Sequence, residues 1–129
     1  LTNLRSLPFQ PRQVLADVQA TADVGVVTLA AGRAKTSVPS KVLGYMAAGR
    51  PVLAAVDADS DTARQVDGDG AGMVTPPDDP EALAAAATRL ANDAALRQQM
   101  GAAARTAFLR DYAKASVLER YEAMLRQLL

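Results

Sequence analysis

Two short apolar runs constrain the fold of this chain most strongly. They are VGVVTL at residues 24–29 and VLAAV at residues 52–56, and neither alternates polar with apolar residues. Continuous runs of this length are typical of strands that are covered on both faces of a parallel sheet. The segment between them carries an apolar stripe at helical spacing over residues 40–48 and stops at Gly49. This order predicts a β-loop-α-β unit with a right-handed crossover.

The residues around this unit continue the alternation of strands and helices. Residues 3–7 are predicted as a short strand that ends at Pro8, and residues 11–23 as a helix. After the second apolar run, a polar stretch rich in Asp-Gly steps is predicted to form turns, with one helical turn at residues 62–66. The segment GMVT, residues 72–75, is predicted as a further short strand.

Three helices are predicted in succession after these strands. Asp79 as N-cap, Pro80 at the first helical position and Glu81 in the first turn mark the start of the first helix. The second is predicted over residues 94–109 and the third from Lys114. Their apolar stripes consist of Leu83, Ala86, Ala87 and Leu90, then Leu96, Met100, Ala103 and Ala107, and finally Val117, Tyr121, Met124 and Leu128.

Together these elements predict an α/β fold, a doubly wound parallel sheet with helices on both faces and a helical C-terminal tail. We expect residues 1–129 to be part of one domain, with the sheet in about residues 1–78 and the C-terminal helices in residues 79–129. In such sheets, ligands lie beyond the carboxyl ends of the strands. The loop at residues 30–40 is therefore expected in the ligand position.

Composition removes several classes of function. The chain has no Cys and no His, which excludes thiolate chemistry, an imidazole base and a His-ligated metal. Its 14 basic and 14 acidic residues balance and only 4% of its residues are aromatic, so no nucleic-acid partner is expected. No segment is long and apolar enough to span a membrane. Because the first residues, LTNLRSLPFQ, contain neither an initiator Met nor a signal sequence, we expect the chain to be part of a longer protein.

The start of the helix at residues 40–48 is a candidate anion site. A helix N-terminus has unpaired N–H groups and a partial charge of about +0.5, which suits a phosphate. Ser40 adds a hydroxyl and Lys41 a full charge, although a cation here opposes the helix dipole by roughly 0.3–1 kcal/mol unless an anion binds. The alternative is that Ser37 or Ser40 is only an N-cap and Lys41 a solvated surface residue. Residue spacing leaves both interpretations open.

The acidic residues indicate no metal site. Asp57, Asp59 and Asp61 resemble the opening of a calcium loop, but Thr62 stands where Gly is required and Gly68 where a bidentate Glu is required. We therefore expect no bound metal, and the sequence assigns no catalytic residue.

Three longer motifs follow one another with a distinctive order and spacing. They are MAAGRPVLA at residues 46–54, DGDGAGMVTPPDDPEAL at residues 67–83 and LRQQMGAAAR at residues 96–105. In this arrangement nearly the whole chain resembles the carboxyl-terminal domain of the GT-B glycosyltransferases of family 4, the glycosyl transferases group 1. The resemblance implies a Rossmann-like domain that is half of a GT-B enzyme, with the N-terminal acceptor domain absent from this chain.

The resemblance also implies a function. In this family the domain binds a nucleoside-diphosphate sugar, UDP- or GDP-linked, and the enzyme transfers the sugar to a hydroxyl without a metal or other cofactor. The helix that matches residues 40–48 presents backbone amides to the diphosphate. The donor contacts implied for this chain are Ser40 and Lys41 at the diphosphate, Thr36 and Ser37 near the sugar, and Phe9 and Gln10 near the base.

The chain departs from the family at two positions. Many members carry two glutamates eight residues apart, and the matching residues here are Thr36 and Gly44. The chain is more similar to bacterial surface-polysaccharide transferases that have a Ser-x-Pro-Ser-Lys run before the helix. This implies a cytoplasmic enzyme, peripheral at the inner membrane face, that uses a lipid-linked acceptor to make a surface polysaccharide or glycolipid. The isolated chain is expected to be inactive, and the alternative is a non-catalytic nucleotide-binding or interaction module of the same fold.

Overall fold

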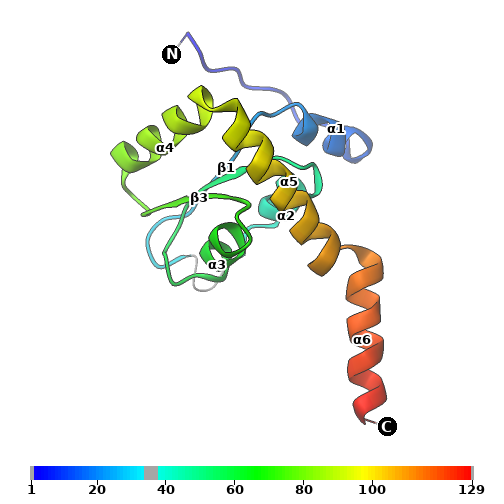
Figure 1. Cartoon of the computed structure of the whole chain (residues 1–129). Helices are drawn as coiled ribbons and strands as arrows, with labels where there is room; N and C mark the ends of the chain where they lie inside the picture. The colour runs from blue at the N-terminus through cyan, green and yellow to red at the C-terminus, as the bar shows by residue number, and fades with distance from the viewer. Residues whose placement is uncertain (1, 34–37, 129) are drawn as a thin grey trace.

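A parallel sheet of three strands organises the part of the chain that the computed structural model describes, residues 2–33 and 38–128 (Figure 1). The strands are β1 (Gly25–Thr28), β2 (Val52–Ala55) and β3 (Gly72–Thr75), in the order β1-β2-β3. Leu53 of β2 pairs with Val26 on one side and with Met73 on the other. The three strands predicted from residues 24–29, 52–56 and GMVT are thus confirmed, and so is their parallel direction.

The helices also follow the predicted order, with differences at the N-terminal end. A 3-10 turn at Arg12–Val14 and a short helix replace the single helix predicted over residues 11–23. The strand predicted at residues 3–7 is wrong, because this segment pairs with no strand and its Leu4 and Leu7 are exposed. The helices are α1 (Leu15–Ala20), α2 (Ser40–Ala47), α3 (Asp61–Gly68), α4 (Pro80–Asn92), α5 (Ala94–Asp111) and α6 (Lys114–Leu128).

Helices cover both faces of the sheet, as predicted. On one face, Val42 and Met46 of α2 share a buried cluster with residues of α3, α5 and the strands. On the other face, Ala86 and Leu90 of α4 pack against Leu53, with partly buried residues of α5 at the margin. Every residue of β2 is buried in consequence, which is the pattern that its continuous apolar sequence indicated. The predicted α4 stripe is correct except for Ala87, which is exposed.

Glycines allow these layers to approach closely. A Cβ on Gly25 of β1 would overlap the ring of Tyr45, which lies on the strand from α2. A Cβ on Gly101 of α5 would collide with the carbonyl oxygen of Gly49, in the turn between α2 and β2. Backbone therefore touches backbone where α5 crosses this turn, and no side chain fits between them.

Arginine side chains satisfy carbonyl groups at the ends of four helices. A helix C-terminus has unpaired carbonyls and a partial negative charge, so a guanidinium from a neighbouring element stabilises it. The pairs are Arg50 with Ala20 of α1, Arg105 with Ala47 of α2, Arg97 with Leu90 and Ala91 of α4, and Arg120 with Asp111 of α5.

The last helix extends away from the sheet and its covering helices (Figure 1). The C-terminal helical tail was predicted, and α6 begins at the predicted Lys114. Among the described residues of α6 none is buried, and the apolar residues on one side of it are exposed. They include Leu118, Tyr121, Met124, Leu125 and Leu128. No helix in the described part of the chain is both long and apolar enough to cross a membrane.

The contact between Gly101 and Gly49 gives a test of the packing. Gly to Ala inside a helix ordinarily stabilises by about 1 kcal/mol. For Gly101→Ala we expect the opposite sign, a loss of about 1–3 kcal/mol in the free energy of unfolding, because the methyl group pushes α5 away from a backbone oxygen. Gly68→Ala is the matched control, since nothing lies within 4 Å of that site at the end of α3. Urea unfolding measures both, and equal stabilisation by the two substitutions would contradict the packing described here.

The ion pairs of Arg110 can be tested by the pH dependence of stability. Its guanidinium bonds to Asp69 at 2.8 Å and to Asp111 at 2.5 Å, and this hydrogen bond to Arg110 lowers the pKa of Asp111 below its ordinary value. A lowered carboxyl pKa adds stability above about pH 4 that is lost as pH falls through the lowered value. We expect Arg110→Ala to be less stable than the wild type at pH 7 and the difference to shrink below about pH 4. Thermal melting from pH 7 to pH 2.5 measures this. Arg126→Ala is the control, because Arg126 pairs with Glu122 on the exposed surface of α6. A constant difference in stability across that pH range would contradict the prediction.

Candidate functional site

The carboxyl ends of the three strands lie at one edge of the sheet, where the chain leaves each strand into a connecting segment. The strand ladder continues one step past the strands, since Leu29 N–H donates to Ala55 at 3.0 Å and Val56 N–H to Thr75 at 3.1 Å. Three helices, α2, α3 and α4, begin after these segments. Parallel direction therefore gathers three loops and three helix N-termini at this edge.

Two of these helix N-termini are capped by their own side chains. Ser60 accepts the Ala63 N–H at 3.1 Å at the start of α3, and Asp79 accepts the Ala82 N–H at 2.9 Å at the start of α4. Asp79 and Pro80 thus have the places that the sequence predicted. At α2 the N-cap is Pro39, whose side chain has no acceptor, and no side-chain cap is present among the described residues. The first turn of α2 also contains no acidic residue.

Ser40 and Lys41 lie together at this uncapped start of α2. Both are exposed, while Val42 and Met46 turn into the core and fix the rotation of the helix. Ser40 is the first helical residue, so the interpretation of Ser40 as an N-cap is wrong; Ser37 lies outside the described residues. A hollow of about 310 Å³ joins Ser40 and Lys41 to the end of β1, and it is lined also by Pro39 and residues 26–29. Its helix dipole, free amides and ammonium group suit an anion.

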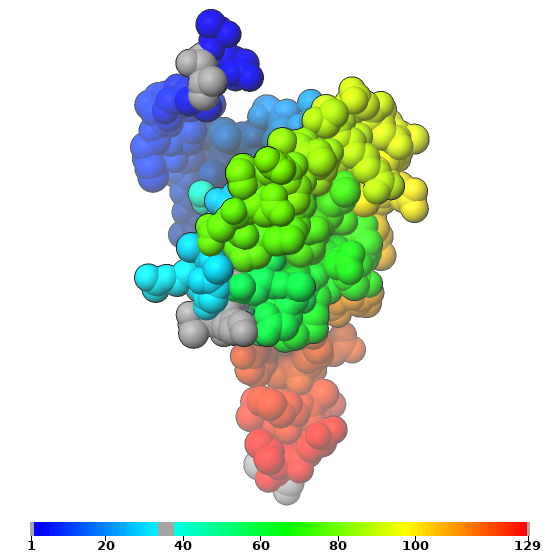
Figure 2. Space-filling model, turned by 90° about the vertical axis from the view of Figure 1, so that its left-hand side faces the viewer, coloured from blue at the N-terminus to red at the C-terminus, as the bar shows by residue number. Residues whose placement is uncertain are grey.

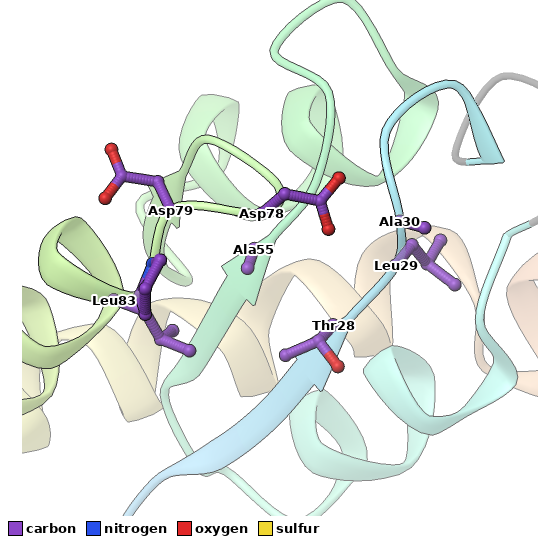
Figure 3. Close-up of a pocket in the computed structure, with 8 residues that line it drawn as sticks. Thr28, Leu29, Ala30, Ala55, Asp78, Asp79 and Leu83 are labelled. Atoms are coloured by element: carbon purple, nitrogen blue, oxygen red, sulfur yellow. The ribbon is translucent and has the colours of Figure 1, made fainter.

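A second cavity, of about 400 Å³, lies at the same edge between the end of β1 and the start of α4 (Figure 3). Thr28, Ala55 and Leu83 line it from the sheet and from α4. Figure 3 shows the carboxylate of Asp78 directed toward the segment after β1, whereas that of Asp79 points away from it. The two neighbouring aspartates therefore serve different elements.

Two carboxylates hold the segment that follows β1. Ala31 N–H donates to Asp78 Oδ2 at 3.1 Å, and Gly32 N–H donates to both oxygens of Asp57, at 3.1 Å and 2.9 Å. Sequence analysis considered Asp57 only as part of a calcium loop and assigned no role to Asp78. A signal was present, since each aspartate comes within three residues of the end of a strand, where functional loops gather. Within the described residues, no group of three acidic side chains is close enough together to hold a metal ion.

Gly44, one of the two positions that the resemblance matches to a glutamate of many members, lies under a side chain of α1. A Cβ at Gly44 would overlap the amide group of Gln19, which is partly buried. A larger residue at position 44 could be accommodated only if Gln19 moved. Gln19 thus lies over the position where a side chain at residue 44 would begin.

In the described part of the chain, the other residues predicted to contact the donor do not lie at this site. Thr36 and Ser37 lie outside the described residues. Phe9 is 97% exposed, and the Gln10 side chain donates to the Pro8 carbonyl at 2.8 Å. Figures 1 and 2 show the N-terminal segment, in dark blue, well away from the light blue segment that follows β1. The assignment of Phe9 and Gln10 to the base stays a prediction.

Comparison with known proteins identifies the family. The family model described as Glycosyl transferases group 1 matches residues 2–93, which include the whole sheet and α2. A Pseudomonas aeruginosa protein described as a probable glycosyltransferase, WbjE, is 35% identical over 112 residues, which cover 85% of this chain and 27% of that protein. The chain spans about a quarter of the length of this relative. No solved structure matches the chain. The matched residues and the α/β fold agree, and the chain belongs to the group 1 family of glycosyl transferases.

Proposed function

We propose that this chain is the donor-binding part of a glycosyltransferase that moves a sugar from a UDP- or GDP-linked donor to a hydroxyl acceptor. The observation that carries the proposal is the start of α2. There Ser40 and Lys41 are exposed beside a proline that cannot cap the helix, at the carboxyl edge of a parallel sheet. Membership of the glycosyl transferases supports sugar transfer in general, and the anion-binding character of this helix start supports a phosphate-linked donor.

In this proposal, α2 binds the diphosphate in the donor and stabilises it as it leaves. Negative charge increases on the diphosphate as the bond to the sugar breaks, so fixed positive groups stabilise the transition state more than the ground state. The amides at the first turn of α2 supply a partial charge of about +0.5 that needs no reorganisation. Lys41 adds a full charge, and its unfavourable interaction with the helix dipole disappears when a diphosphate lies between them. The proposal requires no metal and no other cofactor.

A second part of the proposal concerns the whole protein, beyond the residues of this chain. We infer a larger enzyme in which an N-terminal domain binds the acceptor, because the chain spans only about a quarter of its relative. The exposed apolar side of α6 would then be covered by that domain, and the isolated chain would be inactive. The acceptor would be lipid-linked at the cytoplasmic face of the inner membrane, and the product a surface polysaccharide or glycolipid.

One observation favours a second candidate, a non-catalytic nucleotide-binding module. Gly44 has no carboxylate, and Gln19 fills the adjacent space. The two candidates differ in turnover. Release of free nucleotide from a donor in the presence of acceptor extract supports the enzyme, whereas donor binding without any release supports the module.

Substitution of Lys41 tests the diphosphate role. In the full-length protein, we expect Lys41→Ala to weaken binding of UDP or GDP about tenfold and binding of the monophosphates less, because the loss of one charge matters more as phosphate charge increases. Calorimetric titration with a panel of UDP- and GDP-sugars and the free nucleotides measures this. Lys114→Ala is the control, because Lys114 is also an exposed lysine in the first turn of a helix, α6. Equal diphosphate binding by Lys41→Ala and the wild type would refute the role.

A further inference from the structure

The segment after β1 bends over the carboxyl edge of the sheet and is fastened there at two consecutive amides. Asp78 follows β3, which is separated from β1 by β2, yet its carboxylate accepts the N–H of Ala31. Asp57 follows β2 and accepts the next amide, that of Gly32, with both oxygens. Each of the three strands therefore contributes its first connecting residues to one hydrogen-bonded unit.

The backbone at both ends of this unit has the left-handed conformation. Gly32 has φ +76° and Asp78 has φ +57°. The two successive N–H groups at this turn each donate to a carboxylate, and successive backbone amides of this kind bind anions. Asp is among the few residues other than Gly that adopt positive φ readily, and at position 78 this conformation accompanies the carboxylate that reaches the segment after β1.

This unit borders the region of the proposed donor. Leu29 and Ala30, just before the fastened amides, line the cavity next to α4, and Leu29 also lines the hollow that contains Ser40 and Lys41. The position of Leu29, which borders both hollows, therefore affects the wall between them. A diphosphate would meet two fixed carboxylates nearby, so a simple charge argument says that they repel it. Their hydrogen bonds to the loop argue for the opposite net effect.

We propose that Asp57 and Asp78 are positioning residues for the donor site, which hold the segment after β1 in the form that admits the nucleotide. This inference rests on the proposed function. The two carboxylates act through Ala31 and Gly32 and do not touch the donor. They stabilise the bent segment because a hydrogen bond from an amide to a carboxylate is stronger than one to a neutral acceptor. Their benefit to donor binding therefore exceeds the repulsion that their charges cause.

The test uses variants of the full-length protein that separate the hydrogen bond from the charge and from the backbone conformation. Asp57→Ala and Asp78→Gly remove the acceptors, and glycine at position 78 keeps the positive φ without strain. Asp57→Asn and Asp78→Asn remove the charge but keep an acceptor oxygen. We expect donor affinity to fall about tenfold in the first pair and clearly less in the Asn pair, with small changes in the melting temperature.

Two further measurements distinguish positioning from a general loss of stability. The KM for the donor should rise with the KM for the acceptor unchanged, and amide hydrogen exchange should accelerate in the peptide that contains residues 29–33. Asp67→Ala is the control, because Asp67 is an exposed aspartate in the last turn of α3, at the opposite end of that helix from the carboxyl edge of the sheet. Its donor affinity should equal that of the wild type.

The outcomes that overturn the inference differ from those that overturn the function. Tighter donor binding by Asp57→Ala and Asp78→Gly would show that repulsion dominates and would refute the positioning role. Donor affinity equal to that of Asp67→Ala would refute it as well. If the unsubstituted protein binds no nucleotide sugar of the panel, the proposed function fails, and the role in donor binding fails with it. In that case the exchange data still report whether the two carboxylates fasten the segment.

Discussion

Burial of β2 on both faces is the constraint on which the rest of this structure depends. A strand without a polar face can exist in water only if helices cover both sides and strands flank both edges. Here Val52 and Ala54 face the cluster with α2, α3 and α5, while Leu53 faces α4. Parallel neighbours follow, since β1, β2 and β3 are joined by crossovers through α2 and α3. The same constraint places the carboxyl ends of the three strands at one edge, so short loops are enough to form a binding site there.

The electrostatics of that edge are uneven in a way that the capping pattern explains. The starts of α3 and α4 are already capped by Ser60 and Asp79, which accept hydrogen bonds from their first turns. The start of α2 has a proline before it and a lysine in it, and no described side chain caps it. These residues lower the stability of the helix locally, and binding of an anion at its N-terminus would explain why they are present.

Much of this fold could be predicted from the sequence, because its signals are local. Continuous apolar runs located the strands, helical periodicity located α2, and the Asp79-Pro80 pair located the start of α4 within one residue. The mistaken strand at residues 3–7 shows the limit of such signals, since Leu4 and Leu7 have no partner strand to pair with. The fastening of Ala31 and Gly32 was not predictable in this way. It joins residues 47 and 25 positions apart, and only the assembled sheet brings them together. The contact of Gln19 with Gly44 is equally a product of how α1 packs on α2.

The arginines at the helix ends have a consequence for how this molecule responds to its solvent. The helix ends of α1, α2, α4 and α5 are tied to other elements by guanidinium groups, which keep their charge at every pH that a cell experiences. Acid or alkali in that range leaves these ties intact. Free guanidinium ions, however, have the same shape and donors as the side chains and can occupy the same carbonyls. Guanidinium chloride should therefore loosen the helical layers by direct competition in addition to its general denaturing effect, whereas urea carries no charge to the helix ends.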